Sequence, residues 1–60
     1  MMIDETSVNY VIDKLPEHLH GYARAWFAHM KGSAAAPTIK DFNISYSEGQ
    51  RARLALAASL

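Results

Sequence analysis

Residues 15–32, LPEHLHGYARAWFAHMKG, carry the strongest structural signal in this chain of 60 residues. The proline stands where the first turn of a helix tolerates a residue without an amide proton, and Gly32 stands where helices commonly end. Between them, apolar residues recur at intervals of three and four, which is the spacing of a buried helical face. These residues are Leu19, Tyr22, Ala23, Trp26, Phe27 and Met30. The spacing predicts a core helix over about residues 16–31.

The segment before the core helix predicts another helix, over about residues 4–14. Asp4 or Thr6 would cap its first turn, and Lys14 suits the negative end of the helix dipole. Its apolar residues follow helical spacing. They are Val8, Val11, Ile12 and Leu15. Because Pro16 disfavours helical backbone at the residue before it, we expect a break between the two helices, with one kinked helix as the alternative.

The residues after the core helix, GSAAAPT at positions 32–38, form the clearest break in the chain. The proline of this stretch is suited to the first turn of a helix. A short helix is therefore predicted over about residues 37–42, with Ile39 and Phe42 on one side. Asn43 tolerates the left-handed backbone that closes a helix, so a tight turn is expected to follow.

A last helix is predicted over about residues 46–59. Ser45 and Glu48 match the S-x-x-E pattern of a capping box, and Ser47 is an alternative cap. The apolar residues beyond them are mostly small and spread around the helix, so periodicity does not define the buried face. The predicted fold class is all-α: a small bundle of three to four helices, of which a helix-turn-helix can be part.

Length, composition and charge bound the function. Sixty residues form one domain, residues 1–60, and a chain this short buries too little surface to be strongly stable alone, so a protein partner or a second copy is expected. There is no cysteine, no apolar run of membrane-spanning length and no signal-peptide pattern, which predicts a cytoplasmic protein without a membrane partner. Six basic residues balance six acidic ones, whereas dedicated nucleic-acid binders are usually basic. Arg51 and Arg53 nevertheless allow a local basic surface near the C-terminus.

The spacing of the three histidines argues against a metal site. His18 and His20 are two residues apart and point to different sides of a helix. His18 and His29 share a side but are separated by about 16 Å of helix rise. No Gly-rich phosphate loop or nucleophile motif is present, and so short a chain has little room for a water-excluding pocket. We therefore expect no enzyme activity, no metal, no cofactor and no small-molecule substrate.

The core helix has candidate surface for a partner. Gly21, Ala25 and Ala28 form a strip of small side chains that would let another backbone approach, although alanine is also simply a good helix former. Trp26 and Met30 lie together, and so small a domain has difficulty covering both. Aromatic residues and methionine are enriched in interface cores, so these five residues are the predicted protein interface.

Three pieces of the chain resemble region 4 of sigma factors and the related helix-turn-helix of phage antitermination proteins. They are LPE at 15–17, IKDFNIS at 39–45 and SEGQRARL at 47–54. The resemblance covers about residues 15–58 and is most specific where Phe-Asn-Ile-Ser stands in place of the usual Leu-Gly-Ile-Ser. It implies that the last helix enters a DNA groove. The positions that match the groove-facing part are Tyr46, Ser47, Gln50, Arg51 and Arg53.

The chain also departs from this family pattern. Ile39 stands where a small alanine is usual, Pro37 is not required by the family, and Gly49 weakens the first turn of the last helix. That helix has only two basic residues.

Two functions follow from these observations. The first is a small helix-turn-helix transcription regulator of phage or mobile-element origin that binds DNA as a dimer. The second is a small helical adaptor or inhibitor that acts by protein–protein contact. A fragment or subunit whose core is completed by other chains is a third interpretation.

Overall fold

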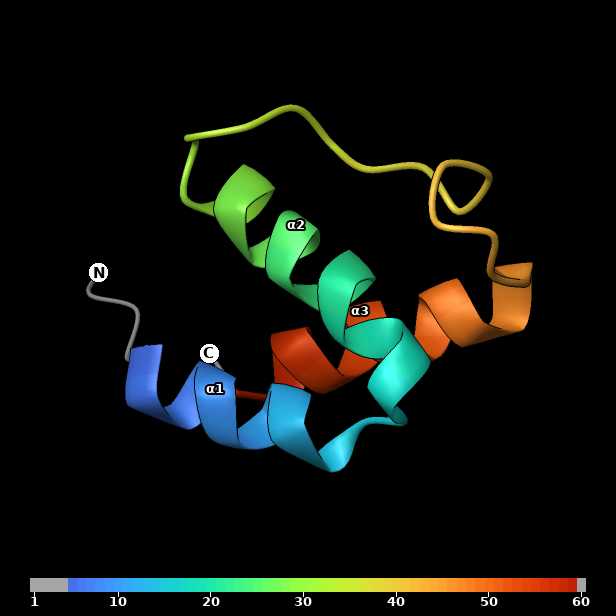
Figure 1. Cartoon of the computed structure of the whole chain (residues 1–60). Helices are drawn as coiled ribbons and strands as arrows, with labels where there is room; N and C mark the ends of the chain where they lie inside the picture. Colours follow the sequence, from blue (N-terminus) through green and yellow to red (C-terminus); the bar gives the residue numbers. More distant parts are fainter. Residues whose placement is uncertain (1–4, 60) are drawn as a thin grey trace.

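Three α-helices and one short 3-10 helix make up the fold in the computed structural model, which describes residues 5–59. The elements are α1 (Glu5–Lys14), η1 (Glu17–Leu19), α2 (His20–Met30) and α3 (Tyr46–Ala58). No strand occurs within residues 5–59, so the predicted all-α class is confirmed. Figure 1 shows the helices around a common centre, with residues 31–45 arching from the end of α2 to the start of α3. Within the same described range, no helix combines the length and hydropathy that a membrane span requires.

The chain breaks between α1 and α2 at the predicted position. Pro16 has an extended backbone, with φ −51° and ψ 142°, and the turn after it is the 3-10 helix η1 rather than the first turn of an α-helix. His20 Nε2 donates a hydrogen bond of 2.8 Å to the carbonyl of Leu15, which would otherwise lack a helical partner. The expected cap at Asp4 lies outside the described residues.

The end of α2 is also where the sequence predicts it. Gly32 has a φ of +81°, a left-handed conformation that a side chain would strain. The amide of Ser33 donates to the carbonyl of Ala28 at 3.0 Å, so the last turn of the helix is closed by backbone hydrogen bonds.

The core is entirely hydrophobic within the described residues. Its members come from α1, the break, η1, α2 and α3. They are Val8, Ile12, Leu15, Leu19, Tyr22, Ala23, Phe27, Ala52 and Leu56. Burial of each large side chain contributes roughly 1.5–3 kcal/mol. Of the predicted face of α2, Trp26 is only half-buried and Met30 is 38% exposed.

The short helix expected over residues 37–42 is not formed. Residues 39–43 make turns instead, closed by a hydrogen bond of 3.1 Å from the amide of Ile44 to the carbonyl of Ile39. Asn43 has the predicted left-handed backbone, with φ 54°. A helix of one to two turns is costly to nucleate. The side chains of Ile39 and Phe42 instead pack on two different helices, and this packing sets the backbone.

We call residues 31–45 the strap, because two of its side chains hold it across α2 and α3. Phe42 lies on Gly21 of α2, where a Cβ atom would be 3.4 Å from Phe42 Cε1. Ile39 lies on Gly49 of α3, where a Cβ atom would be only 2.6 Å from Ile39 Cγ2. An apolar side chain of the strap packs on each helical glycine, but only at position 49 would a Cβ atom clash, which explains the glycine there better than helix propensity does.

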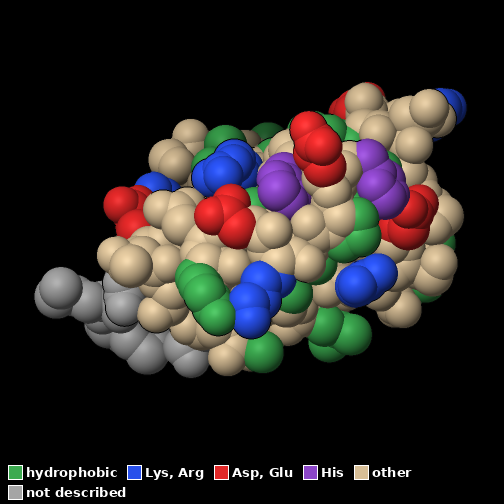
Figure 2. Space-filling model, turned by 60° about the horizontal axis from the view of Figure 1, so that its bottom comes forward, with side chains coloured by type: hydrophobic (Ala, Val, Ile, Leu, Met, Phe, Trp, Pro, Cys, Tyr) green, Lys and Arg blue, Asp and Glu red, His purple; other side chains and the backbone are tan. Residues whose placement is uncertain are grey.

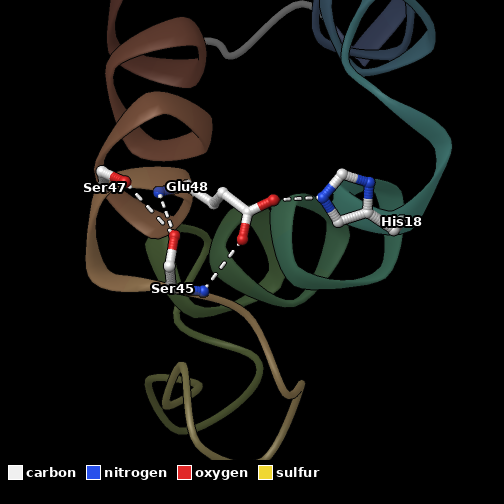
Figure 3. A network of polar contacts seen from close by, with 4 residues as sticks. All are labelled: His18, Ser45, Ser47 and Glu48. Atoms are coloured by element: carbon white, nitrogen blue, oxygen red, sulfur yellow. Dashed lines mark hydrogen bonds and ion pairs between the residues drawn. The ribbon is translucent and has the colours of Figure 1, made fainter.

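A complete capping box begins α3, as the S-x-x-E pattern predicts (Figure 3). The amide of Glu48 donates to Ser45 Oγ at 3.2 Å, and the amide of Ser45 donates to Glu48 Oε1 at 3.0 Å. These two bonds fix the entry of the chain into α3, and with it the direction of the side chains that follow.

Candidate functional site

A groove lies between the strap, α2 and α3, with a volume of about 240 Å³. It combines aromatic and apolar walls with a polar edge. Its lining residues are Tyr22, Trp26, Pro37, Ile39, Tyr46, Gly49, Gln50 and Arg53. We call this feature the groove.

The α3 side of the groove follows from helix spacing. Tyr46, Gly49, Gln50 and Arg53 stand at i, i+3, i+4 and i+7, which places them on one face once the capping box has fixed the first turn. Gln50 Nε2 donates a hydrogen bond of 3.1 Å to the hydroxyl oxygen of Tyr46. The glycine in this row lets the strap approach closely enough to form the opposite wall.

The α2 side of the groove is aromatic. Tyr22 and Trp26 meet edge to face, with ring centroids 6.2 Å apart. Tyr22 also meets Phe42 of the strap edge to face at 5.7 Å. Such pairs contribute about 0.5–1.5 kcal/mol beyond their buried area, so the aromatic wall is held in place by its own neighbours.

Among the described residues, Arg53 is the only charged one that lines the groove. Its guanidinium lies over the Trp26 ring, 5.4 Å from the centroid. The ion pairs found within residues 5–59 are His18–Glu48, Arg24–Asp13 and Lys31–Glu5, and none of them includes Arg53. The groove thus carries a positive charge that no carboxylate of the described chain neutralises.

Trp26 also has an unused hydrogen-bond donor. Its Nε1 is buried and has no hydrogen-bond partner among the described residues. An indole N–H is a donor only, and a buried donor without an acceptor costs roughly 1–3 kcal/mol. This indole of the aromatic wall therefore has a donor that no acceptor within residues 5–59 satisfies.

The capping carboxylate of α3 has a strongly lowered pKa. The backbone amide of Ser45 and the imidazole of His18 both donate to Glu48, and these bonds lower its pKa from 4.5 to about 2. Figure 3 shows His18 reaching across to the end of the Glu48 side chain. This contact ties η1 to the first turn of α3, beside the start of the groove wall.

The residues predicted to contact DNA do not all share one surface. Tyr46, Gln50 and Arg53 lie together in the groove. Ser47 instead contacts the hydroxyl of Ser45 at 3.2 Å, and Arg51 is exposed outside the groove lining. On the face in Figure 2, basic, acidic and histidine side chains are interspersed rather than gathered by sign.

The residues predicted as a protein interface are likewise divided. Trp26 lines the groove, and Met30 is exposed at the end of α2. The Phe42 ring of the strap packs on Gly21, while Ala25 and Ala28 are half-buried. The small-residue strip therefore accommodates a segment of the same chain at its first position.

Four groove residues had no functional prediction from sequence: Tyr22, Pro37, Ile39 and Gly49. The sequence feature that pointed to this part of the groove was the glycine inside α3. A glycine inside a helix costs about 1 kcal/mol relative to alanine, so its presence indicates that something packs closely against it. What it packs against could not be read from the local sequence.

The described residues include no cluster of side chains suited to a metal ion. Within residues 5–59, no three histidine, aspartate or glutamate side chains are placed to hold one metal ion. The resemblance to region 4 of sigma factors rests on the quoted residues alone. Comparisons with protein-family models, with curated proteins and with solved structures find no match to this chain.

Proposed function

We propose that this chain acts by binding another protein through the face that contains the groove. The observation that supports this proposal is the groove itself: a small, aromatic-walled hollow lined by one arginine that forms no ion pair within residues 5–59. Catalysis would require convergent acid, base or nucleophilic groups, and the titratable residues that line the groove within residues 5–59 are two tyrosines and one arginine.

The composition of this face supports the proposal. Tryptophan, tyrosine and arginine are the residues most enriched at binding hot spots, and all three meet in the groove. Tyr46 of the groove lining is 65% exposed, and Phe42, which meets Tyr22 of the lining edge to face, is 38% exposed. A fold of this size gains from covering such surface with a partner, which can be another protein or a second copy of the chain.

The experiment is site-specific crosslinking with a matched control. A photo-reactive phenylalanine analogue replaces Tyr46 in one variant and Tyr10 in another, because both tyrosines are exposed, at 65% and 62%, and Tyr10 lies on α1 outside the groove lining. The proposal expects one defined polypeptide to be crosslinked from position 46, in cells that make this protein, and not from position 10. Equal crosslinking from both positions, or crosslinking to nucleic acid alone, would contradict it.

DNA binding through α3 is the second candidate. It is supported by the exposed Arg51, by the left-handed turn at Asn43 and by the capping box that follows this turn. Binding of this kind falls steeply between low and moderate salt, and Arg53→Ala should weaken it further. The absence of salt-sensitive DNA binding at micromolar concentration would remove this candidate.

A further inference from the structure

We infer that the groove selects an acidic segment of a partner protein, with one apolar side chain inserted between Trp26 and Ile39 and an adjacent carboxylate bound by Arg53. This inference rests on the proposed protein-binding function and specifies the chemistry of the partner.

The size of the groove limits what can enter. Pockets that hold drug-sized ligands and cofactors have volumes of about 300–1,000 Å³. The groove has about 240 Å³ and opens to solvent beside the exposed Tyr46. A single side chain of a peptide fits these dimensions better than a cofactor does.

The walls select an apolar side chain. Trp26 and Tyr22 present aromatic surface from α2, and Pro37 and Ile39 present aliphatic surface from the strap. Removal of apolar surface from water contributes roughly 25 cal/mol per Å², so an aliphatic anchor gains from burial here. A polar anchor would lose its hydration without finding a matching partner on these walls.

The charge of the groove selects a carboxylate. Arg53 is held over Trp26, so its guanidinium is already positioned at the groove edge. No carboxylate within residues 5–59 pairs with it, and no acidic residue lines the groove. An arginine can bind a carboxylate through two parallel hydrogen bonds, which makes an aspartate or glutamate beside the anchor its natural partner.

The polar groups of the groove also suit a peptide backbone. Gln50 and Tyr46 stand beside Arg53 on α3 and provide both donors and acceptors. Peptide amides and carbonyls can pair with these two side chains, whereas the buried Trp26 Nε1 is out of reach of a ligand in the groove. A nucleobase could stack on the same aromatic residues, so an oligonucleotide is included in the test.

The test is a titration of the ¹⁵N-labelled chain with blocked pentapeptides, followed by NMR. Trp26 is the only tryptophan, so its indole N–H gives a single resonance that reports on the groove. The probes are Ac-Ala-Asp-Leu-Asp-Ala-NH₂, the same peptide with lysine in place of both aspartates, and the same peptide with serine in place of leucine. A single-stranded oligothymidine is the nucleic-acid probe.

The expected result is that the acidic leucine peptide shifts the Trp26 resonance and binds at least tenfold more tightly than the lysine and serine peptides. Arg53→Gln should reduce this preference for acid over lysine to about twofold. Arg51→Gln is the matched control, because Arg51 is exposed on the same helix but does not line the groove. This variant should keep the full preference.

Three outcomes would overturn the inference in distinguishable ways. Equal binding of the acidic and lysine peptides at Trp26 would refute acid selection while leaving the protein-binding function in place. Equal loss of preference in Arg51→Gln and Arg53→Gln would show that net charge, and not the groove, is responsible. No shift with any peptide at millimolar concentration, with a shift on oligothymidine, would refute both the inference and the proposed function.

Discussion

Substitution of Gly49 by alanine should destabilise this protein, although alanine is the better helix former. In the interior of a helix, the change from glycine to alanine alone gains about 1 kcal/mol. Here the added Cβ would lie 2.6 Å from Ile39 Cγ2, whereas carbon atoms pack best at about 3.5–4.0 Å. The strap would have to move outward by about 1 Å at this point.

The expected magnitude follows from these opposing effects. Overpacking of this kind costs about 1–3 kcal/mol. We take about 2 kcal/mol, because the Ile39 side chain that would have to move is only half-buried. Subtracting the propensity gain leaves a net loss of about 1 kcal/mol in the free energy of unfolding. For a domain of this size, this loss corresponds to a decrease in Tm of about 4–8 °C.

Gly21→Ala is the matched control. At this position the added Cβ would lie 3.4 Å from Phe42 Cε1, which is ordinary van der Waals contact. The propensity gain should then dominate, and the protein should be stabilised by about 0.5–1 kcal/mol. The two glycine substitutions are therefore expected to have opposite signs.

The assay is urea denaturation followed by circular dichroism, with the midpoint compared at constant slope. A double-mutant cycle with Ile39→Ala isolates the contact, because removing the Ile39 γ-carbons should make Gly49→Ala stabilising in that background. If Gly49→Ala stabilises the wild-type chain as much as Gly21→Ala does, the packing of the strap on α3 is wrong.

Two further predictions concern the start of α3. Ser45→Ala removes the side-chain cap and should lower the free energy of unfolding by about 1 kcal/mol, whereas Ser45→Thr should retain most of the stabilisation by the cap. Thermal denaturation measures the difference. An equal loss of stability in both variants would contradict the capping role. Because the pKa of Glu48 is lowered to about 2 in the folded chain, its stabilisation is present above about pH 4.5 and is lost as the pH falls from there toward 2. Unfolding curves of Glu48→Gln should therefore depend less on pH across this window, and a dependence equal to that of wild type would refute the contribution of Glu48.

The parts of the fold that the sequence predicts are those set by local signals. The break at Pro16, the end of α2 at Gly32 and the capping box of Ser45 and Glu48 each depend on residues within one turn of each other. The buried face of α2 follows from apolar spacing because its side chains are large and regularly placed. The buried face of α3 was not predicted, since Gly49, Ala52 and Leu56 include two of the smallest residues.

The strap could not be predicted because its conformation depends on distant contacts. Pro37 and Asn43 are residue types typical of the start and the end of a helix, so the local sequence predicts a short helix between them. Ile39 and Phe42 instead pack on glycines of two different helices, which only the tertiary arrangement reveals.

The candidate site shows the same division between local and distant information. Helix spacing alone groups Tyr46, Gln50 and Arg53 on one face of α3, and the size of the domain suggests that Trp26 is incompletely covered. That these two sets of residues line one hollow depends on how α2 and α3 cross and on where the strap lies. No local pattern carries that information.

The groove exists only if the strap is seated between α2 and α3, and nuclear Overhauser effects in the free chain measure this directly. We expect cross-peaks from the Ile39 γ2-methyl to the Hα protons of Gly49 and to the Tyr22 ring, together with cross-peaks from the Phe42 ring to the Hα protons of Gly21. Random-coil chemical shifts across the strap without these cross-peaks would contradict both the groove and the binding function proposed for it.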